Sequence, residues 1–419
     1  MHTRIQKIQE YLLLIIPLLL ITGPFLPDLA LSIMCIIFLI EKIYKKEFNI
    51  LKIDLFGKVF FLWCLYLVIL SSLSQNPYLS FESSLFFFRF GVFAYAVKAT
   101  ILNNPDYIKK FFYFLTFIIL FVIIDGYSQY FFGKNFFGYS YEGHRLTLFD
   151  DTKFIGHYLA RLLPIIIAVA ISHFLNSKIL LLLISLIFIS ADVLIFLSGE
   201  RTSFFILSLF TFIILALISK WKIVRLATII ISTIVIIIIV RSDSIVKGRM
   251  VTQTINQTGA GVTFSPEHDL LFESSFNIFL DHKYFGVGPK LFRSLCSDKK
   301  YARDIFGYRD TITSWDETNS CNTHPHNMYL QLLAETGIIG TLPVIIFFLY
   351  LSFLLFRQFL SILFKKKYIF DDFVICLTAS IFVQLWPIMP HLSVFNNRVN
   401  VFIFLTIGLL MTSQYFKRK

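Results

Sequence analysis

Long apolar runs, separated by polar connections, dominate the chain from end to end. A helix needs roughly twenty apolar residues to cross a bilayer. Twelve segments reach or approach that length, at 9–23, 26–43, 56–73, 83–102, 110–131, 154–174, 178–198, 202–219, 224–240, 328–357, 370–389 and 399–414. The pattern predicts an all-α polytopic membrane protein with about 12 transmembrane helices. Gly23, Pro24 and Pro27 interrupt the first pair, where one kinked re-entrant pair is the alternative.

Two polar connections between these segments are long, 132–153 and the 85-residue stretch 241–325. The second is too polar to lie in lipid, but apolar runs such as Leu270 to Phe272 predict that it forms a small helical cap on the membrane. We therefore expect transmembrane helices 1–9 in residues 1–240, a large helical loop domain in 241–325, and helices 10–12 in 326–419.

Composition and charge agree with this class. The 419 residues are 57% hydrophobic and 15% charged, which is more apolar than a soluble domain. Lys and Arg recur in the connections that follow the even-numbered apolar segments. The positive-inside rule then places both termini in the cytoplasm and residues 241–325 outside. The net charge of +12 thus indicates orientation in a bilayer and not a nucleic-acid surface.

The five cysteines fall into two groups. Cys35, Cys64 and Cys376 lie in apolar runs, whereas Cys296 and Cys321 share the long polar connection. Two thiols in one extracytoplasmic loop predict a disulfide, worth about 3 kcal/mol by loop-closure arguments. The alternative is a pair of free thiols.

The polar connection ends in a segment that runs directly into an apolar helix, Thr323 to Gly340. If Asn327 to Gly340 form one helix, a narrow stripe on one face contains His326, Leu330, Leu333, Gly337 and Gly340. The glycines would let a neighbouring backbone approach and so fix the aim of the imidazole, a proton acceptor near neutral pH. Alternatively, His326 and Asn327 only cap the helix and the glycines only serve packing.

Charged side chains inside spans or at their outer mouths are costly and usually face a cavity. Four arginines fit this description: Arg89, Arg145, Arg161 and Arg201. A guanidinium suits bidentate capture of a diphosphate. The alternative is structural pairing, such as Arg201 with Glu200 or Arg89 with Asp125. The adjacent carboxylates Asp150 and Asp151 could orient an acceptor or pair with Arg145.

The sequence His326-Asn327, followed after nine residues by Gly337-x-x-Gly340, resembles the signature of bacterial O-antigen ligases and O-antigen polymerases. The turn Ser198 to Arg201 is similar to an outer turn of this family that carries an arginine. The sequence Gly286-Val287-Gly288 resembles the Gly-x-Gly turn of the same family. His268 stands where the family has a second basic residue, commonly arginine in ligases. The resemblance covers about residues 80–410.

This resemblance implies a metal-independent glycosyltransferase without a cofactor, in the bacterial inner membrane with its active site in the periplasm. The donor would be a glycan on a polyprenyl diphosphate, and the acceptor lipid A-core. His326 would act as general base, while Arg201, Arg161 and His268 hold the diphosphate; Arg89, Arg145 and Asn327 are further substrate-binding candidates. No histidine or carboxylate spacing indicates a metal site.

Three alternatives remain open. An O-antigen polymerase would instead join lipid-linked repeat units and therefore use a lipid-linked glycan as acceptor. A polytopic transporter or flippase should show repeated halves, which the sequence lacks. A purely structural membrane scaffold would give no reason to place histidine and arginines at one face.

Overall fold

The computed structural model describes residues 2–47, 53–149, 152–174, 176–259, 265–302 and 320–413. It is 75% helical, and the described residues contain no strand. The all-α class predicted from the apolar pattern is therefore confirmed.

The helices follow one another with mostly short connections. Before the long polar connection they are α1 (His2–Leu19), α2 (Phe25–Tyr44), α3 (Leu55–Ser72), α4 (Pro77–Ser84), α5 (Phe88–Asn103), α6 (Tyr107–Phe132), α7 (Ile155–His173), α8 (Lys178–Leu197), α9 (Arg201–Leu217) and α10 (Lys222–Ser242). The connection itself holds α11 (Ser244–Lys247), a π-helix (Gly248–Thr252), α12 (Gln253–Gly259), α13 (Pro266–Asp281) and α14 (Phe292–Leu295). The chain continues with α15 (Met328–Lys365), α16 (Asp372–Gln384) and α17 (Asn397–Leu410).

Each predicted apolar segment falls on a helix, although 83–102 is divided between α4 and α5. Among the described residues, seven helical stretches are long and apolar enough to cross a membrane: Leu55–Ser72, Pro77–Asn103, Tyr107–Phe132, Ile155–His173, Lys178–Leu197, Lys222–Ser242 and Met328–Lys365. The protein is thus a polytopic membrane protein with seven candidate spans. The count of twelve stays a prediction.

The shorter apolar helices α16 and α17 have 13 and 14 residues. At 1.5 Å per residue each is roughly 20 Å long, less than the hydrocarbon thickness of about 30 Å. Nearly all of their residues are buried, since α16 packs on α7 and α17 on α5. Their apolar character therefore reflects a place in the protein core, which the sequence pattern cannot distinguish from a lipid-facing span.

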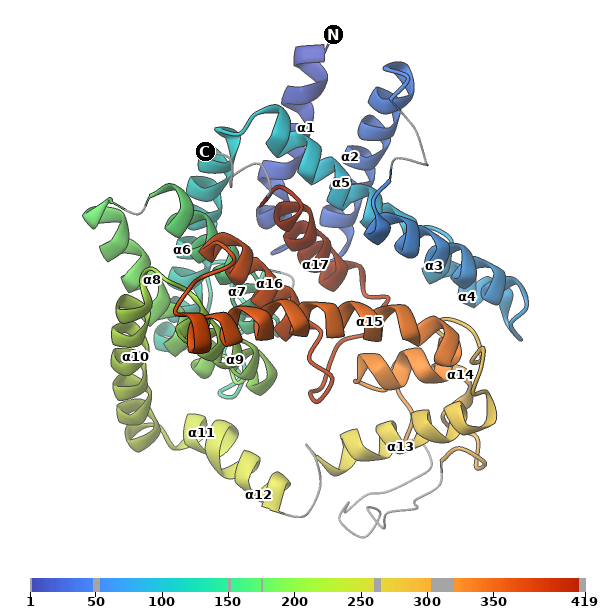
Figure 1. The fold of residues 1–419 in the computed structure, drawn as a ribbon. Coiled ribbons are helices and arrows are strands. Elements are labelled where there is room, and N and C mark those ends of the chain that lie inside the picture. Colours follow the sequence, from blue (N-terminus) through green and yellow to red (C-terminus); the bar gives the residue numbers. More distant parts are fainter. Residues whose placement is uncertain are drawn as a thin grey trace.

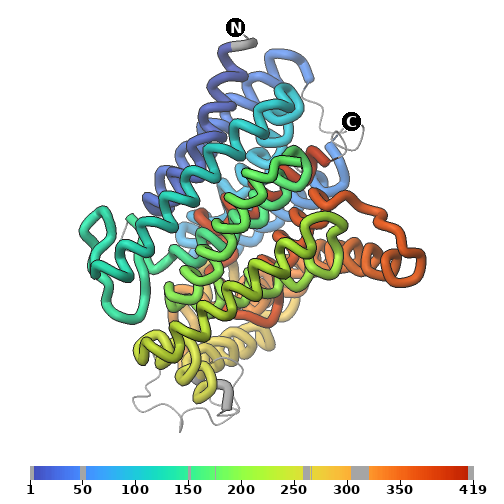
Figure 2. Tube along the Cα trace, turned by 90° about the vertical axis from the view of Figure 1, so that its left-hand side faces the viewer, coloured from blue at the N-terminus to red at the C-terminus, as the bar shows by residue number. Residues whose placement is uncertain are grey.

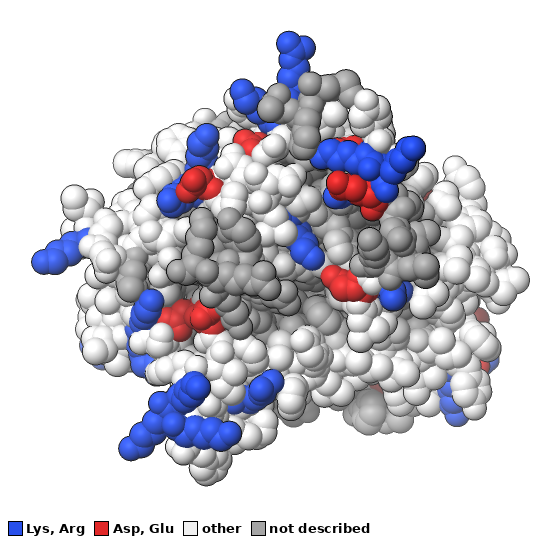
Figure 3. Space-filling view, turned by 45° about the horizontal axis from the view of Figure 1, so that its top comes forward, with Lys and Arg blue, Asp and Glu red and all other residues white. Residues whose placement is uncertain are grey.

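The helices of the polar connection gather at one end of the molecule. Figure 1 shows α11, α12 and α13 on the side opposite to both termini, and the side view in Figure 2 agrees. Figure 3 presents the end that carries the termini, where Lys and Arg side chains lie around the surface, several beside Asp or Glu. Among these helices, α13 packs on α15, the helix that begins directly after the sequence-predicted histidine.

Candidate active site

His326 lies in a turn before α15 and not on the helix itself. Its φ of +54° is in the left-handed region, and its carbonyl accepts a hydrogen bond from the backbone N–H of His391 at 2.6 Å. The loop between α16 and α17 therefore fixes where this imidazole points. Burial lowers the pKa of His326, so the ring is neutral near pH 7 and can accept a proton.

Asn327 is the N-cap of α15. Its Oδ1 accepts hydrogen bonds from the backbone N–H groups of Tyr329 and Leu330, at 3.0 and 3.1 Å, and its Nδ2 donates to the carbonyl of Pro387 at 2.9 Å. Both ends of the amide are engaged, and they attach the start of α15 to the loop after α16. Asn327 thus acts on the site through the backbone of His326, and the substrate contact predicted for it stays a prediction.

The expected stripe of one continuous helix is wrong, because α15 is broken at Gly337. This residue has φ +63° and ψ −173°, outside the helical region. A Cβ on Gly337 would overlap the carbonyl oxygen of Tyr284, so no other residue type fits against the loop that inserts there.

The inserted loop is the Gly286-Val287-Gly288 turn. Val287 donates its N–H to the carbonyl of Ala334 at 3.0 Å, and Gly288 donates to that of Glu335 at 2.8 Å. Two glycine motifs that the sequence presents separately therefore form one joint between the loop domain and α15. This joint, and not a helix–helix seam, sets the position of His326 relative to the loop.

At Gly340 the predicted approach of a neighbouring backbone is wrong, because side chains of α3 pack there instead. Trp63 donates from Nε1 to the carbonyl of Gly340 at 2.7 Å, and the Tyr66 hydroxyl donates to the carbonyl of Thr336 at 2.7 Å. These two bonds attach α3 to α15 on either side of the break at Gly337.

Three histidine rings meet at the start of α15. The ring centroids of His268 and His324 lie 5.4 Å and 4.2 Å from that of His326. Burial, aided by the charges of His326 and Arg201, lowers the pKa of His268 to about 4. His268 is therefore neutral at pH 7, and the diphosphate contact predicted for it cannot depend on a positive charge there.

Arg161 lies about two turns inside α7 and is 2% exposed. Its Nη1 donates to Nδ1 of His157 at 2.8 Å and to the carbonyl of His157 at 3.2 Å, while its Nε has no hydrogen-bond partner. No described carboxylate lies within ion-pair distance of this guanidinium. An unpaired guanidinium at such depth is costly, which makes it a candidate for binding an anion.

Three further guanidiniums surround the turn that carries Gly199. Arg201 begins α9 and donates to Oε1 of Gln257 at 2.6 Å. Arg145 packs on the turn so closely that a Cβ on Gly199 would lie 3.3 Å from its side chain. Arg249 of the π-helix donates to the carbonyl of Gly199 at 3.3 Å.

The charges of this group act on one another. Burial and the neighbouring charges of Arg145 and Arg201 lower the pKa of Arg249 to about 10. Like charges held together in this way favour binding of a polyanion, which relieves their repulsion. The sequence suggested Arg145 and Arg201 as binding residues but not Arg249, because only the fold brings Arg249 close to them.

Arg89 does not belong to this group. It donates from Nε and Nη2 to Oδ1 of Asp28, at 3.0 and 2.8 Å. The structural pair was the right alternative, with Asp28 as partner, because Asp125 instead accepts from the N–H of Phe136 at 2.7 Å. Asp150 and Asp151 lie outside the described residues.

Cys296 and Cys321 are joined by a disulfide, with a Cα–Cα distance of 4.8 Å, as the sequence predicts. The bond attaches the end of α14 to the segment that leads into His326. Among the described residues, no group of three histidine, cysteine, aspartate or glutamate side chains is arranged to hold a metal ion.

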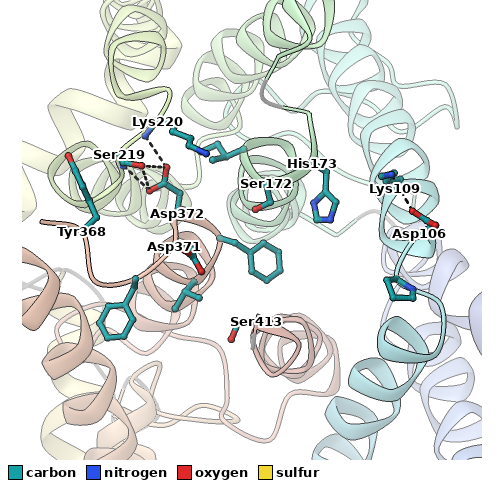
Figure 4. A pocket seen from close by; sticks show the side chains of 15 residues that line it. Asp106, Lys109, Ser172, His173, Ser219, Lys220, Tyr368, Asp371, Asp372 and Ser413 are labelled. Carbon is teal, nitrogen blue, oxygen red and sulfur yellow. Dashed lines mark hydrogen bonds and ion pairs between the residues drawn. The ribbon is translucent and has the colours of Figure 1, made fainter. Parts of the chain in front are cut away.

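A cavity of about 550 Å³ lies away from these residues. Its lining comes from the ends of α7, α9 and α17 and the starts of α6 and α16, including Lys109, His173, Lys220 and Asp371 (Figure 4). This cavity shares no residue with the histidine and arginine groups, so we do not place the active site in it. We assign the candidate active site to the cluster around His326.

Comparison with known proteins indicates the family that this part of the chain resembles. No curated protein matches the chain. A family model described as O-antigen ligase matches residues 180–345, a range that contains Arg201, Arg249, His268 and His326. Over residues 180–345 the chain is therefore similar to the O-antigen ligase family.

Proposed function

We propose that the protein transfers a glycan from a polyprenyl diphosphate to lipid A-core, as an O-antigen ligase of the bacterial inner membrane. The observation that carries this proposal is the partly exposed imidazole of His326 beside His268, whose ring is in turn affected by the charge of Arg201, a guanidinium without a carboxylate partner among the described residues. The family match supports lipid-linked glycans as the substrate class.

In the proposed reaction the acceptor hydroxyl attacks the anomeric carbon of the donor sugar. His326 takes the hydroxyl proton as the new glycosidic bond forms. The bond from the anomeric carbon to the diphosphate oxygen breaks, and the electron pair leaves with the polyprenyl diphosphate. Arg161, Arg201, Arg145 and Arg249 would stabilise the negative charge on this leaving group.

The membrane arrangement follows from the same proposal. We place both termini in the cytoplasm and α11 to α14 in the periplasm, with twelve apolar helices in or beside the bilayer. The basic connections of the sequence and the separation of the two ends in Figure 2 support this orientation. The division into residues 1–240, 241–325 and 326–419 belongs to this proposal as well.

One specific observation keeps the polymerase as a second candidate. His268, at the position where ligases commonly have arginine, has its pKa lowered to about 4 by burial and carries no charge at neutral pH. The two enzymes would share donor and chemistry and differ in acceptor. Purified protein incubated with a polyprenyl-diphosphate glycan, and with either lipid A-core or a second lipid-linked repeat, separates them: product on lipid A-core supports the ligase, and elongated lipid-linked product alone supports the polymerase.

A further inference from the structure

Glu200 is a buried carboxylate that joins two helix starts. Its Oε1 accepts from the N–H of Gly156 at 2.8 Å, and its Oε2 accepts from the N–H of His157 at 3.0 Å and from the Ser203 hydroxyl at 3.0 Å. The first two donors belong to the first turn of α7, where backbone N–H groups have no helical partner. The carboxylate therefore fixes the start of α7 against the arginine turn before α9.

The same carboxylate faces the His157 ring. Nε2 of His157 lies 3.7 Å from Oε2 of Glu200, and the other ring nitrogen, Nδ1, lies 2.8 Å from Nη1 of Arg161. A guanidinium has only donors, so Nδ1 must be the acceptor and the proton must reside on Nε2, toward Glu200. The hydrogen bond from Arg161 thus sets one tautomer of His157, and the Nε2–H of that ring faces Glu200 at 3.7 Å, an electrostatic contact beyond hydrogen-bond distance.

This arrangement is what orients Arg161. A second hydrogen bond of the guanidinium also goes to His157, to its backbone carbonyl. Since Arg161 starts one turn deeper in α7 than His157, both bonds draw its guanidinium back toward the outer end of the helix. The carboxylate reaches the guanidinium only through the ring and does not form a contact ion pair with it.

We propose that His157, held by Glu200, is a positioning residue that aims Arg161 at the diphosphate of the lipid-linked donor. The inference rests on the proposed function, because it needs the diphosphate as ligand. A direct Glu200–Arg161 pair would neutralise the guanidinium and compete with the donor. An intervening neutral imidazole keeps the arginine oriented and leaves its remaining N–H groups available.

The groups that face this arrangement come from several elements. The charges of Arg145, Arg161 and Arg398 act on His157, and the neutral ring of His391 also faces it. Burial raises the pKa of Glu200 to about 7, while Arg145 and three hydrogen bonds oppose the rise. The pocket around His157 is therefore rich in positive charge, which a dianionic ligand would complement.

The test uses the full-length protein in detergent, with farnesyl diphosphate as the probe and calorimetric titration as the readout. His157→Phe keeps the ring volume and removes both contacts, and we expect it to weaken binding roughly ten- to a hundredfold, the effect of one hydrogen bond to a charged group. His157→Gln retains one acceptor and one donor and should keep most of the affinity. His173→Phe, at the other end of α7, is the matched control and should bind like the original protein.

A double-mutant cycle separates aiming from folding. In an Arg161→Ala background, His157→Phe should cause no further loss, because it acts only through the guanidinium. Equal losses in both backgrounds, or failure of the original protein to bind the probe, would overturn the inference. If His157→Phe does not accumulate, His157→Asn replaces it in the test. The Asn side chain is too short to reach Arg161, so this variant should show the same loss of affinity for the probe. A protein that binds the probe with this pattern but transfers no glycan would refute the proposed function and leave the arrangement of Arg161, His157 and Glu200 standing.

Discussion

Two buried arginines in this protein differ in the partners that surround their charges. Arg225 and Arg161 are each 2% exposed. Arg225 donates to both carboxylate oxygens of Asp192, at 2.7 and 3.0 Å, and to the Thr211 hydroxyl at 2.6 Å. Arg161 has a histidine as its only side-chain partner among the described residues.

The difference follows from the cost of removing ions from water. A buried ion pair with good geometry recovers much of its desolvation cost, so Asp192 balances the charge of Arg225, although the Nε of Arg225, like that of Arg161, has no hydrogen-bond partner among the described residues. Arg161 has no such compensation. Its charge is useful only if an anion arrives, and this is why we place it, and not Arg225, in the active site.

The largest expected effect comes from removing the unpaired guanidinium. Arg161→Ala should lower the rate of glycan transfer by roughly a hundred- to a thousandfold, the range for loss of one charge-stabilising group. The melting temperature should stay the same or rise, because no ion pair is lost. Transfer assays and thermal unfolding on the same preparation check this, and a folded variant with nearly full activity would remove Arg161 from the site.

The paired arginine should behave in the opposite way. Arg225→Ala leaves Asp192 buried without its partner, so the free energy of unfolding should fall by about 3–5 kcal/mol. Protein that remains folded should bind donor as before. Denaturant unfolding in detergent and the KM for the donor test both halves, and a raised KM with unchanged stability would reverse the comparison.

Acid should weaken the site before it weakens the paired region. Burial lowers the pKa of His391 to about 4, so its ring is neutral in the folded protein and takes up a proton near pH 6.5 only on unfolding. The contribution of this ring to the free energy of unfolding is complete above pH 6.5. It is lost as the pH falls from 6.5 to 4, which lowers that free energy by about 3 kcal/mol. The free energy of unfolding of His391→Gln and of the original protein, measured over this pH range, tests the effect. Identical pH profiles of the two proteins would contradict it.

The smallest effect is expected where both members of the pair are replaced. Arg225→Met combined with Asp192→Leu removes charge and counter-charge together and should change the free energy of unfolding by only about 1 kcal/mol. Donor binding should also be unchanged. A loss as large as that of Arg225→Ala would mean that the pair has a role beyond balancing its own charges.

Local patterns in the sequence predicted those features of the structure that depend on residues close together in the chain. The helices, the Cys296–Cys321 disulfide and the candidate roles of Arg161 and Arg201 rest on apolar period, composition or short motifs. The break at Gly337 was missed because its cause is a loop some fifty residues earlier, and a glycine alone does not state which backbone will press on it. The pairing of Arg89 with Asp28 escaped notice for the same reason, since 61 positions separate them.

Arg249 and Glu200 were missed for a different reason. Neither stands in an apolar run in which a charge would be conspicuous, and Glu200 was considered only as a partner of Arg201. The structure instead places Glu200 on the start of α7 and Arg249 on the carbonyl of Gly199. Both contacts join elements that are adjacent only after folding.

The central claim is that His326 removes the proton from an acceptor hydroxyl while unpaired guanidiniums hold the donor diphosphate. The most direct measurement is the transfer rate in proteoliposomes that contain polyprenyl-diphosphate glycan and lipid A-core, for His326→Ala beside the loop control His282→Ala. The account predicts that His326→Ala still binds farnesyl diphosphate and still folds but transfers no measurable glycan, whereas His282→Ala transfers normally. Transfer by folded His326→Ala at the rate of the original protein would contradict it.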